Sequence, residues 1–89
     1  MKLSTTQIDV LRHMRDGSGV IVRFPGGFWI TPETPIKETH NVPEWSVTIP
    51  TIRALERLHL LERNHEFPEE WRDPRRLTPD GRIEAESLG

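Results

Sequence analysis

Apolar residues first recur at helical spacing between residues 5 and 16. Three of them fall on one face of a helix: Ile8, Leu11 and Met14. Ser4 and Gln7 precede them in the pattern of a capping box, in which each residue satisfies a backbone amide of the other. We therefore expect a helix over about residues 5–16, ended by Gly17 in the left-handed conformation.

A strand-like pattern follows this helix. Val20-Ile21-Val22-Arg23-Phe24 is rich in β-branched residues, and Pro25-Gly26-Gly27 suits a tight turn. Phe28-Trp29-Ile30 can then return as the partner strand. The pattern predicts a β-hairpin across residues 20–30, which must pack against helices because two short strands alone are marginally stable.

Residues 31–47 show neither a helical nor a strand period and hold prolines at positions 32, 35 and 43. They predict a long irregular connection, pinned to the core by Ile36, Val42 and Trp45. A connection of this length inside a compact domain either has a function or contains a short element that the pattern does not reveal.

Helical spacing returns after Thr48, which can cap a second helix, and Pro50 is tolerated in the first turn. Four residues are expected on the inner side: Ile52, Ala54, Leu55 and Leu58. Arg53 and Arg57 then lie on the opposite, outer side. We expect the helix to end at His59, because histidine is enriched among non-glycine residues with positive φ.

The last part of the chain predicts a strand over residues 60–63, a long loop, and a returning strand at residues 75–77. A third helix follows, with Thr78 as its cap, Pro79 in its first position and Asp80 favourable to the helix dipole. Its expected contacts with the core are Ile83 and Leu88.

Two segments resemble winged-helix regulators of the multiple-antibiotic-resistance (MarR) type. Residues 51–63, TIRALERLHLLER, are similar to their recognition helix and following strand, and residues 75–82, RRLTPDGR, to the passage from the second wing strand into the next helix. The resemblance implies an α+β fold: one winged-helix-like domain over residues 1–89, with three helices, an N-terminal β-hairpin and a β-wing.

The sequence departs from that family in one place. A PGGFWI hairpin and a proline-rich connection stand where such domains have a supporting helix before the recognition helix. A few small bacterial and prophage-type proteins of undefined role look similar in carrying this glycine-rich hairpin. The resemblance implies a role in transcription or in phage or plasmid regulation.

Composition weighs against a dedicated nucleic-acid binder, because the formal net charge is −2 and counterion release normally requires a basic excess. The charge is unevenly distributed, however. Residues 48–63 carry +1, whereas residues 31–47 carry −2. Any basic surface must therefore be local and centred on the second helix.

The resemblance places four residues of the second helix toward the major groove of double-stranded DNA: Thr48, Thr51, Arg53 and Arg57. Arginine can bond guanine through two hydrogen bonds, and threonine can meet a phosphate or a thymine methyl. Arg72, Arg75 and Arg76 would contact backbone phosphates from the wing. In the alternative interpretation, Arg53 and Arg57 belong to an ordinary solvated face.

A protein-binding module of the same fold is the second hypothesis. Glu69 and Glu70 lie beside Trp71 in the wing loop, and their charge would repel phosphate. In this hypothesis the chain is an inhibitor or adaptor, and Trp71 is the exposed residue expected to anchor its protein partner. Trp29 and Trp45 are instead expected to close the core.

No pattern in the sequence indicates an enzyme. The four histidines lack metal-ligand spacing, there is no cysteine, and no phosphate loop or nucleophile with its base is present. We expect neither a catalytic residue nor a metal or cofactor. No secretory or membrane-spanning segment is found, so we expect a cytoplasmic protein, with a homodimer through the terminal helices as a possibility.

Overall fold

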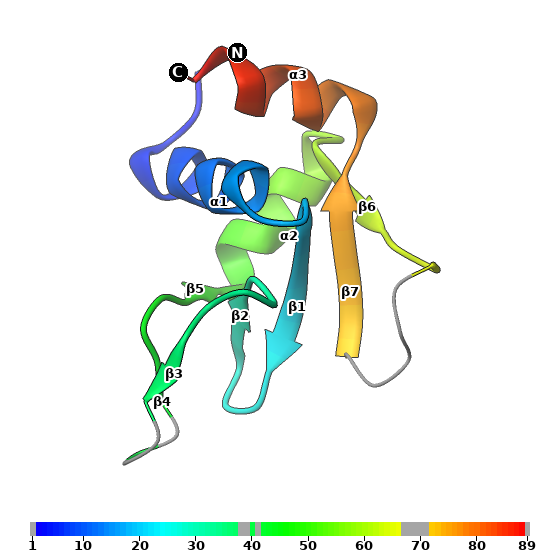
Figure 1. Ribbon diagram of the computed structural model, residues 1–89. Coiled ribbons are helices and arrows are strands. Elements are labelled where there is room, and N and C mark those ends of the chain that lie inside the picture. The colour runs from blue at the N-terminus through cyan, green and yellow to red at the C-terminus, as the bar shows by residue number, and fades with distance from the viewer. Residues whose placement is uncertain (1, 38–39, 41, 67–71, 89) are drawn as a thin grey trace.

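The computed structural model describes residues 2–37, 40, 42–66 and 72–88, with the backbone alone described at Arg72 (Figure 1). Within these ranges the elements follow the order α1 (Thr5–Asp16), β1 (Val20–Phe24), β2 (Phe28–Ile30), β3 (Ile36–Lys37), β4 (Val42–Pro43), β5 (Val47–Thr48), α2 (Ile49–Arg57), β6 (Leu61–Arg63), β7 (Arg72–Leu77) and α3 (Pro79–Ser87). The chain therefore has an α+β fold.

The strands form two antiparallel sheets. A five-stranded sheet has the order β5-β2-β1-β7-β6, and β3 pairs with β4 in a separate two-stranded arm (Figure 1). Phe24 pairs with Phe28, so three residues connect β1 to β2. Two of these, Gly26 and Gly27, have φ of +104° and +85°, values that glycine adopts without steric cost.

Helix α1 begins at the capping box that the sequence predicts. Ser4 Oγ accepts from the backbone amide of Gln7 at 3.2 Å, and Gln7 Oε1 accepts from the amide of Ser4 at 2.9 Å. The prediction of a left-handed Gly17 is wrong, because its φ is −107°. Gly19 has a φ of +78° instead, and its amide donates to the carbonyl of Met14 at 2.9 Å.

Helix α2 begins after Thr48, which has the extended backbone of a capping residue but makes no capping hydrogen bond with its side chain. The chain leaves the helix at His59, whose φ of 60° confirms the predicted left-handed turn. The prediction that Leu58 lies on the inner side is wrong, because 37% of its surface is exposed. The helix ends at Arg57, so Leu58 no longer follows the helical period.

The five-stranded sheet has apolar residues on both faces. The helices cover one face, and their contact with it forms the main core, which contains Val10, Leu11, Met14, Ile21, Trp29, Val47, Ile52, Leu55, Leu60, Leu61, Leu77 and Ala85. Residues on the other face form a smaller cluster: Val20, Val22 and Ile30, with Phe24 and Ile36 packed against them. The alternation of Val20, Ile21 and Val22 between the clusters follows the two-residue period of β1.

Helix α3 is fixed by backbone contacts more than by large side chains. Thr78 Oγ1 accepts from the amide of Gly81 at 2.9 Å and donates to the carbonyl of His59 at 2.6 Å. A Cβ on Gly81 would collide with the backbone of Leu60. The predicted docking residue Ile83 is 65% exposed, so that prediction is wrong, whereas Leu88 does pack against the main core.

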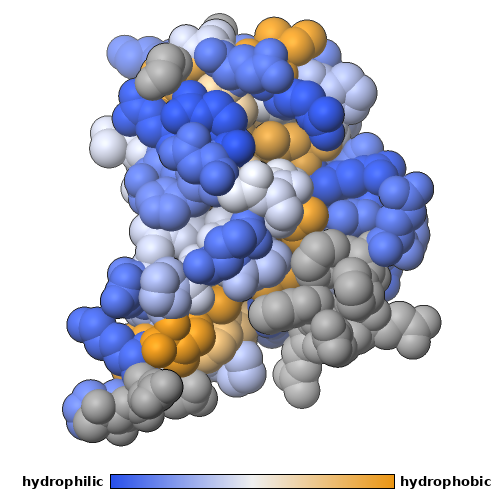
Figure 2. Space-filling model, in the orientation of Figure 1, coloured by the Kyte–Doolittle hydropathy of each residue, from blue (hydrophilic) through white to orange (hydrophobic). Residues whose placement is uncertain are grey.

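The described part of residues 31–47 contains short strands and no helix. Trp45 packs against the main core and Ile36 against the smaller cluster. The prediction that Val42 helps to pin this connection is wrong, because Val42 is 47% exposed. Figure 2 shows the resulting apolar surface over the β3–β4 arm.

The close approach of α3 to Leu60 leads to a stability prediction. Gly81→Ala should lower the free energy of unfolding by about 1–3 kcal/mol, because the added methyl group must displace backbone. Ile83→Ala is the matched control on the same helix and should change it by less than about 0.5 kcal/mol. Urea unfolding followed by circular dichroism measures both. Equal effects of the two substitutions would contradict this account of how α3 is held.

Candidate nucleic-acid interface

Helix α2 presents a cationic outer side. Ile52 and Leu55 are buried in the main core, so Arg53 and Arg57 lie on the opposite side and are exposed. None of the ion pairs between described residues includes either arginine. Both guanidinium groups are therefore accessible to a ligand.

The two threonines assigned to the same interface lie at the beginning of α2. Thr48 is exposed and Thr51 is partly exposed. Thr48 also forms the end of β5, which pairs with β2 through Phe28 and Trp29. The edge of the sheet therefore sets the position from which α2 projects.

Arg76 lies on the face of β7 that points away from the helices. It pairs across the strands with Glu62, and its Nε lies 3.4 Å from Glu62 Oε1. Its Nη1 lies 3.9 Å from Glu66 Oε2. Two glutamates thus oppose the charge of this arginine, which leaves it a weaker attraction for phosphate than Arg53 or Arg57 has.

Arg75 lies on the opposite face, toward the helices. Its guanidinium stands over the Trp29 ring, 5.4 Å from the centroid, and its Nε lies 3.5 Å from Glu56 Oε2. Its Nη1 donates to the carbonyl of Asp73 at 2.9 Å. Because its side chain is only 19% exposed, Arg75 joins β7 to α2 and β2.

Several residues of the predicted site fall outside what the structure describes. The backbone of Arg72 pairs with Arg23 of β1, but its side chain is not described. Glu69, Glu70 and Trp71, which carry the protein-binding hypothesis, lie in residues 67–71 and outside the described ranges.

The sequence-based site omits Arg23, which lies beside the base of α2. Its Nη1 is 3.7 Å from Asp73 Oδ2, and it borders a cavity of about 150 Å³ between α2, β2 and β7. We call this the arginine cavity. Its lining consists of Arg23, Trp29, Ile49, Ile52, Arg53, Glu56, Asp73 and Arg75. One signal in the sequence was available: Arg23 interrupts the otherwise apolar run VIVRF.

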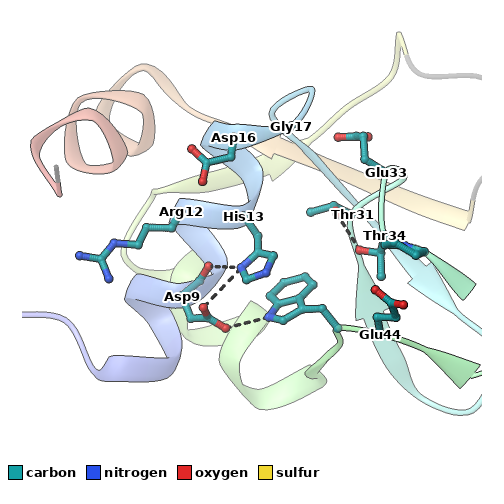
Figure 3. Close-up of a pocket in the computed structure, with 11 residues that line it drawn as sticks. Asp9, Arg12, His13, Asp16, Gly17, Thr31, Glu33, Thr34 and Glu44 are labelled. Atoms are coloured by element: carbon teal, nitrogen blue, oxygen red, sulfur yellow. Dashed lines mark hydrogen bonds and ion pairs between the residues drawn. The ribbon is translucent and has the colours of Figure 1, made fainter.

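A larger cavity of opposite charge lies between α1 and the connection from β2 to β5 (Figure 3). Its volume is about 620 Å³, and four carboxylates and one guanidinium line it: Asp9, Asp16, Glu33, Glu44 and Arg12. We call it the acidic cavity. A phosphate backbone would be repelled from this side of the molecule.

Most carboxylates of the acidic cavity have partners within the protein. Trp45 Nε1 donates to Asp9 Oδ2 at 2.7 Å, and the Trp45 ring stacks on His13 with centroids 4.0 Å apart (Figure 3). Glu33 Oε1 accepts from the amide of Ser18 at 2.7 Å. These contacts attach the connection to α1 and give the cavity a structural role.

No known protein family, curated protein or solved structure matches the chain. The described residues contain no group of His, Asp and Glu side chains arranged to hold a metal ion. In the same part of the chain, no helix has both the length and the apolar character needed to cross a membrane.

The attachment of Trp45 to α1 can be tested by a double-mutant cycle. Asp9→Ala and Trp45→Phe should show a coupling of about 1 kcal/mol in the free energy of unfolding, because each removes the same hydrogen bond to an ionised group. A second cycle pairs Asp16→Ala with Trp45→Phe as a control, since Asp16 lines the cavity without bonding to Trp45. Similar coupling in the two cycles would argue against the bond as the attachment.

Proposed function

We propose that this protein is a non-enzymatic, winged-helix-like DNA-binding regulator in which α2 is the recognition helix. The observation that carries the proposal is the outer side of α2, where Arg53 and Arg57 are exposed and belong to no ion pair between described residues. A helix with two available guanidinium groups matches the chemistry of base recognition in the major groove.

The arrangement of the other elements supports this proposal. Helix α1 precedes β1, α2 precedes β6, and β7 returns antiparallel between β6 and β1 before α3. This is the order that the MarR-type resemblance implies. The strands β2 and β5 occupy the position of the supporting helix, and they hold the beginning of α2 through the pairing of Phe28 with Thr48.

The proposed mechanism divides the contacts into two kinds. Arg53 and Arg57 donate to guanine O6 and N7, while Thr48 and Thr51 meet a phosphate or a thymine methyl near the start of the helix. In the wing, Arg72 and Arg76 would contact phosphates.

Arg75 acts differently in this proposal. Its contacts with Trp29, Glu56 and Asp73 hold the wing strand against α2. It therefore positions the recognition helix and the wing relative to each other, while the exposed arginines of α2 supply the contacts with bases.

The net charge of −2 is compatible with DNA binding if the duplex approaches only one side. Four acidic residues line the cavity beside α1, whereas no ion pair between described residues neutralises Arg53 or Arg57. Because charges separated by more than about 8–10 Å are screened at physiological ionic strength, the local field near α2 governs the encounter.

The acidic surface favours a second candidate function, a protein-interaction module for a partner that carries basic residues. The carboxylates of the acidic cavity would contribute to such an interface. Glu69, Glu70 and Trp71 remain its proposed contacts. This candidate predicts no affinity for duplex DNA at low salt.

Titration of labelled duplex DNA at two salt concentrations tests the leading proposal. Arg53→Ala and Arg57→Ala should each weaken specific binding by about 1–3 kcal/mol, because each removes a bidentate contact with a base. Affinity for random duplexes should fall as salt rises, since that binding depends on counterion release.

Arg82→Ala is the matched control, because it removes an exposed arginine of α3 and should leave the affinity unchanged. Failure to bind any duplex at low salt would reject the DNA proposal and support the protein-binding candidate. A pull-down with and without nuclease would then show whether a polypeptide partner remains.

A further inference from the structure

The arginine cavity gathers three guanidinium groups within a small volume. Arg23, Arg53 and Arg75 come from β1, α2 and β7, and the cavity they border measures about 150 Å³. Two carboxylates, Glu56 and Asp73, lie in the same lining. With three cations against two anions, the lining carries a formal charge of +1.

Two donors in this lining are buried and have no hydrogen-bond acceptor among the residues that the structure describes. They are Trp29 Nε1 and Arg75 Nε, and both residues border the arginine cavity. Glu56 Oε2 lies 3.5 Å from Arg75 Nε, so this pair is an ion pair without a hydrogen bond. Trp29 is 5% exposed, so solvent does not compensate for the missing acceptor. A buried donor without a partner costs about 1–3 kcal/mol. Because both groups are donors, a ligand that reached them would have to be a hydrogen-bond acceptor.

The three arginines differ in how firmly they are held. Arg75 is fixed by the Trp29 ring and by the carbonyl of Asp73, and Arg23 is held by an ion pair with Asp73. Arg53 is exposed and belongs to no ion pair between described residues. Arg75 is thus preorganised, whereas Arg23 and Arg53 are exposed and can move toward a bound anion.

We propose that the arginine cavity binds one phosphate-type oxyanion through Arg23, Arg53 and Arg75. Arginine is suited to this ligand because its guanidinium forms paired, charge-assisted hydrogen bonds with phosphate oxygens. The cavity volume of about 150 Å³ leaves room for a tetrahedral oxyanion.

The phosphate can come from two sources. In the first it is a backbone phosphate of the duplex, and this form of the inference rests on the proposed DNA-binding function. The phosphate would then fix how deeply α2 enters the groove, because Arg53 belongs to both the cavity and the outer side of the helix. In the second it is free phosphate or a small phosphorylated molecule.

Titration with inorganic phosphate, followed by the indole N–H resonances in ¹H–¹⁵N spectra, tests the site directly. Trp29→Phe identifies the Trp29 signal among the three indoles. Phosphate should move this signal saturably, whereas sodium chloride at equal ionic strength should not. Arg23→Ala and Arg53→Ala should each weaken the apparent affinity at least about tenfold, because each removes a charged partner of the anion.

Arg82→Ala serves as the control for loss of one positive charge and should leave phosphate binding unchanged. Since Arg53 and Arg82 are exposed, both variants should fold, and their circular dichroism spectra check this. A linear, unsaturated response, or equal affinities in the wild type, Arg23→Ala and Arg53→Ala, would overturn the proposal.

A second experiment with duplex DNA distinguishes a backbone phosphate from a free phosphate as the ligand. It also separates the proposed phosphate site from the proposed DNA-binding function. A backbone phosphate in the cavity predicts that Arg23→Ala reduces the slope of log affinity against log salt by about 0.9. Saturable phosphate binding without any duplex binding would support the site and reject the DNA proposal. Duplex binding that depends on Arg57, together with no response to phosphate, would reject the site alone.

Discussion

The proposed interface depends on the contacts that Arg75 makes between the sheet and α2. Strand β7 alternates, so Arg75 faces the helices while Arg76 faces away. The guanidinium of Arg75 spans from the Trp29 ring to Glu56, which joins β2, β7 and α2. An uncharged side chain there would leave Glu56 without its counterion and β7 without its link to α2.

The local patterns of the sequence predicted the helices well, because capping is a local interaction. Ser4 with Gln7 and Thr78 with Gly81 are separated by three residues each, and both bonds form as expected. Two caps did not form as expected, since Gly17 is not left-handed and Thr48 makes no capping hydrogen bond with its side chain. Two other errors arose where a periodic pattern was extended past its element or taken as sufficient. Leu58 follows the last residue of α2, and Ile83 lies on a helix that docks through a glycine.

The contacts that define the candidate site are long-range and left little trace in the sequence. Trp45 and Asp9 are 36 positions apart, and Arg23 meets Asp73 only because β1 pairs with β7. Periodicity assigns a residue to a face but does not identify the strand that will lie beside it. The sequence shows the positions of the three arginines, but predicting that they border one cavity also requires the order of the strands in the sheet.

The edges of the five-stranded sheet limit how this protein can associate. β5 contributes two residues and β6 three, and two of the three in β6 are the charged Glu62 and Arg63. Borders this short and polar offer few consecutive backbone groups to an incoming strand. Extension of the strand ladder from one molecule to the next, the route to fibrous aggregates, is thereby disfavoured.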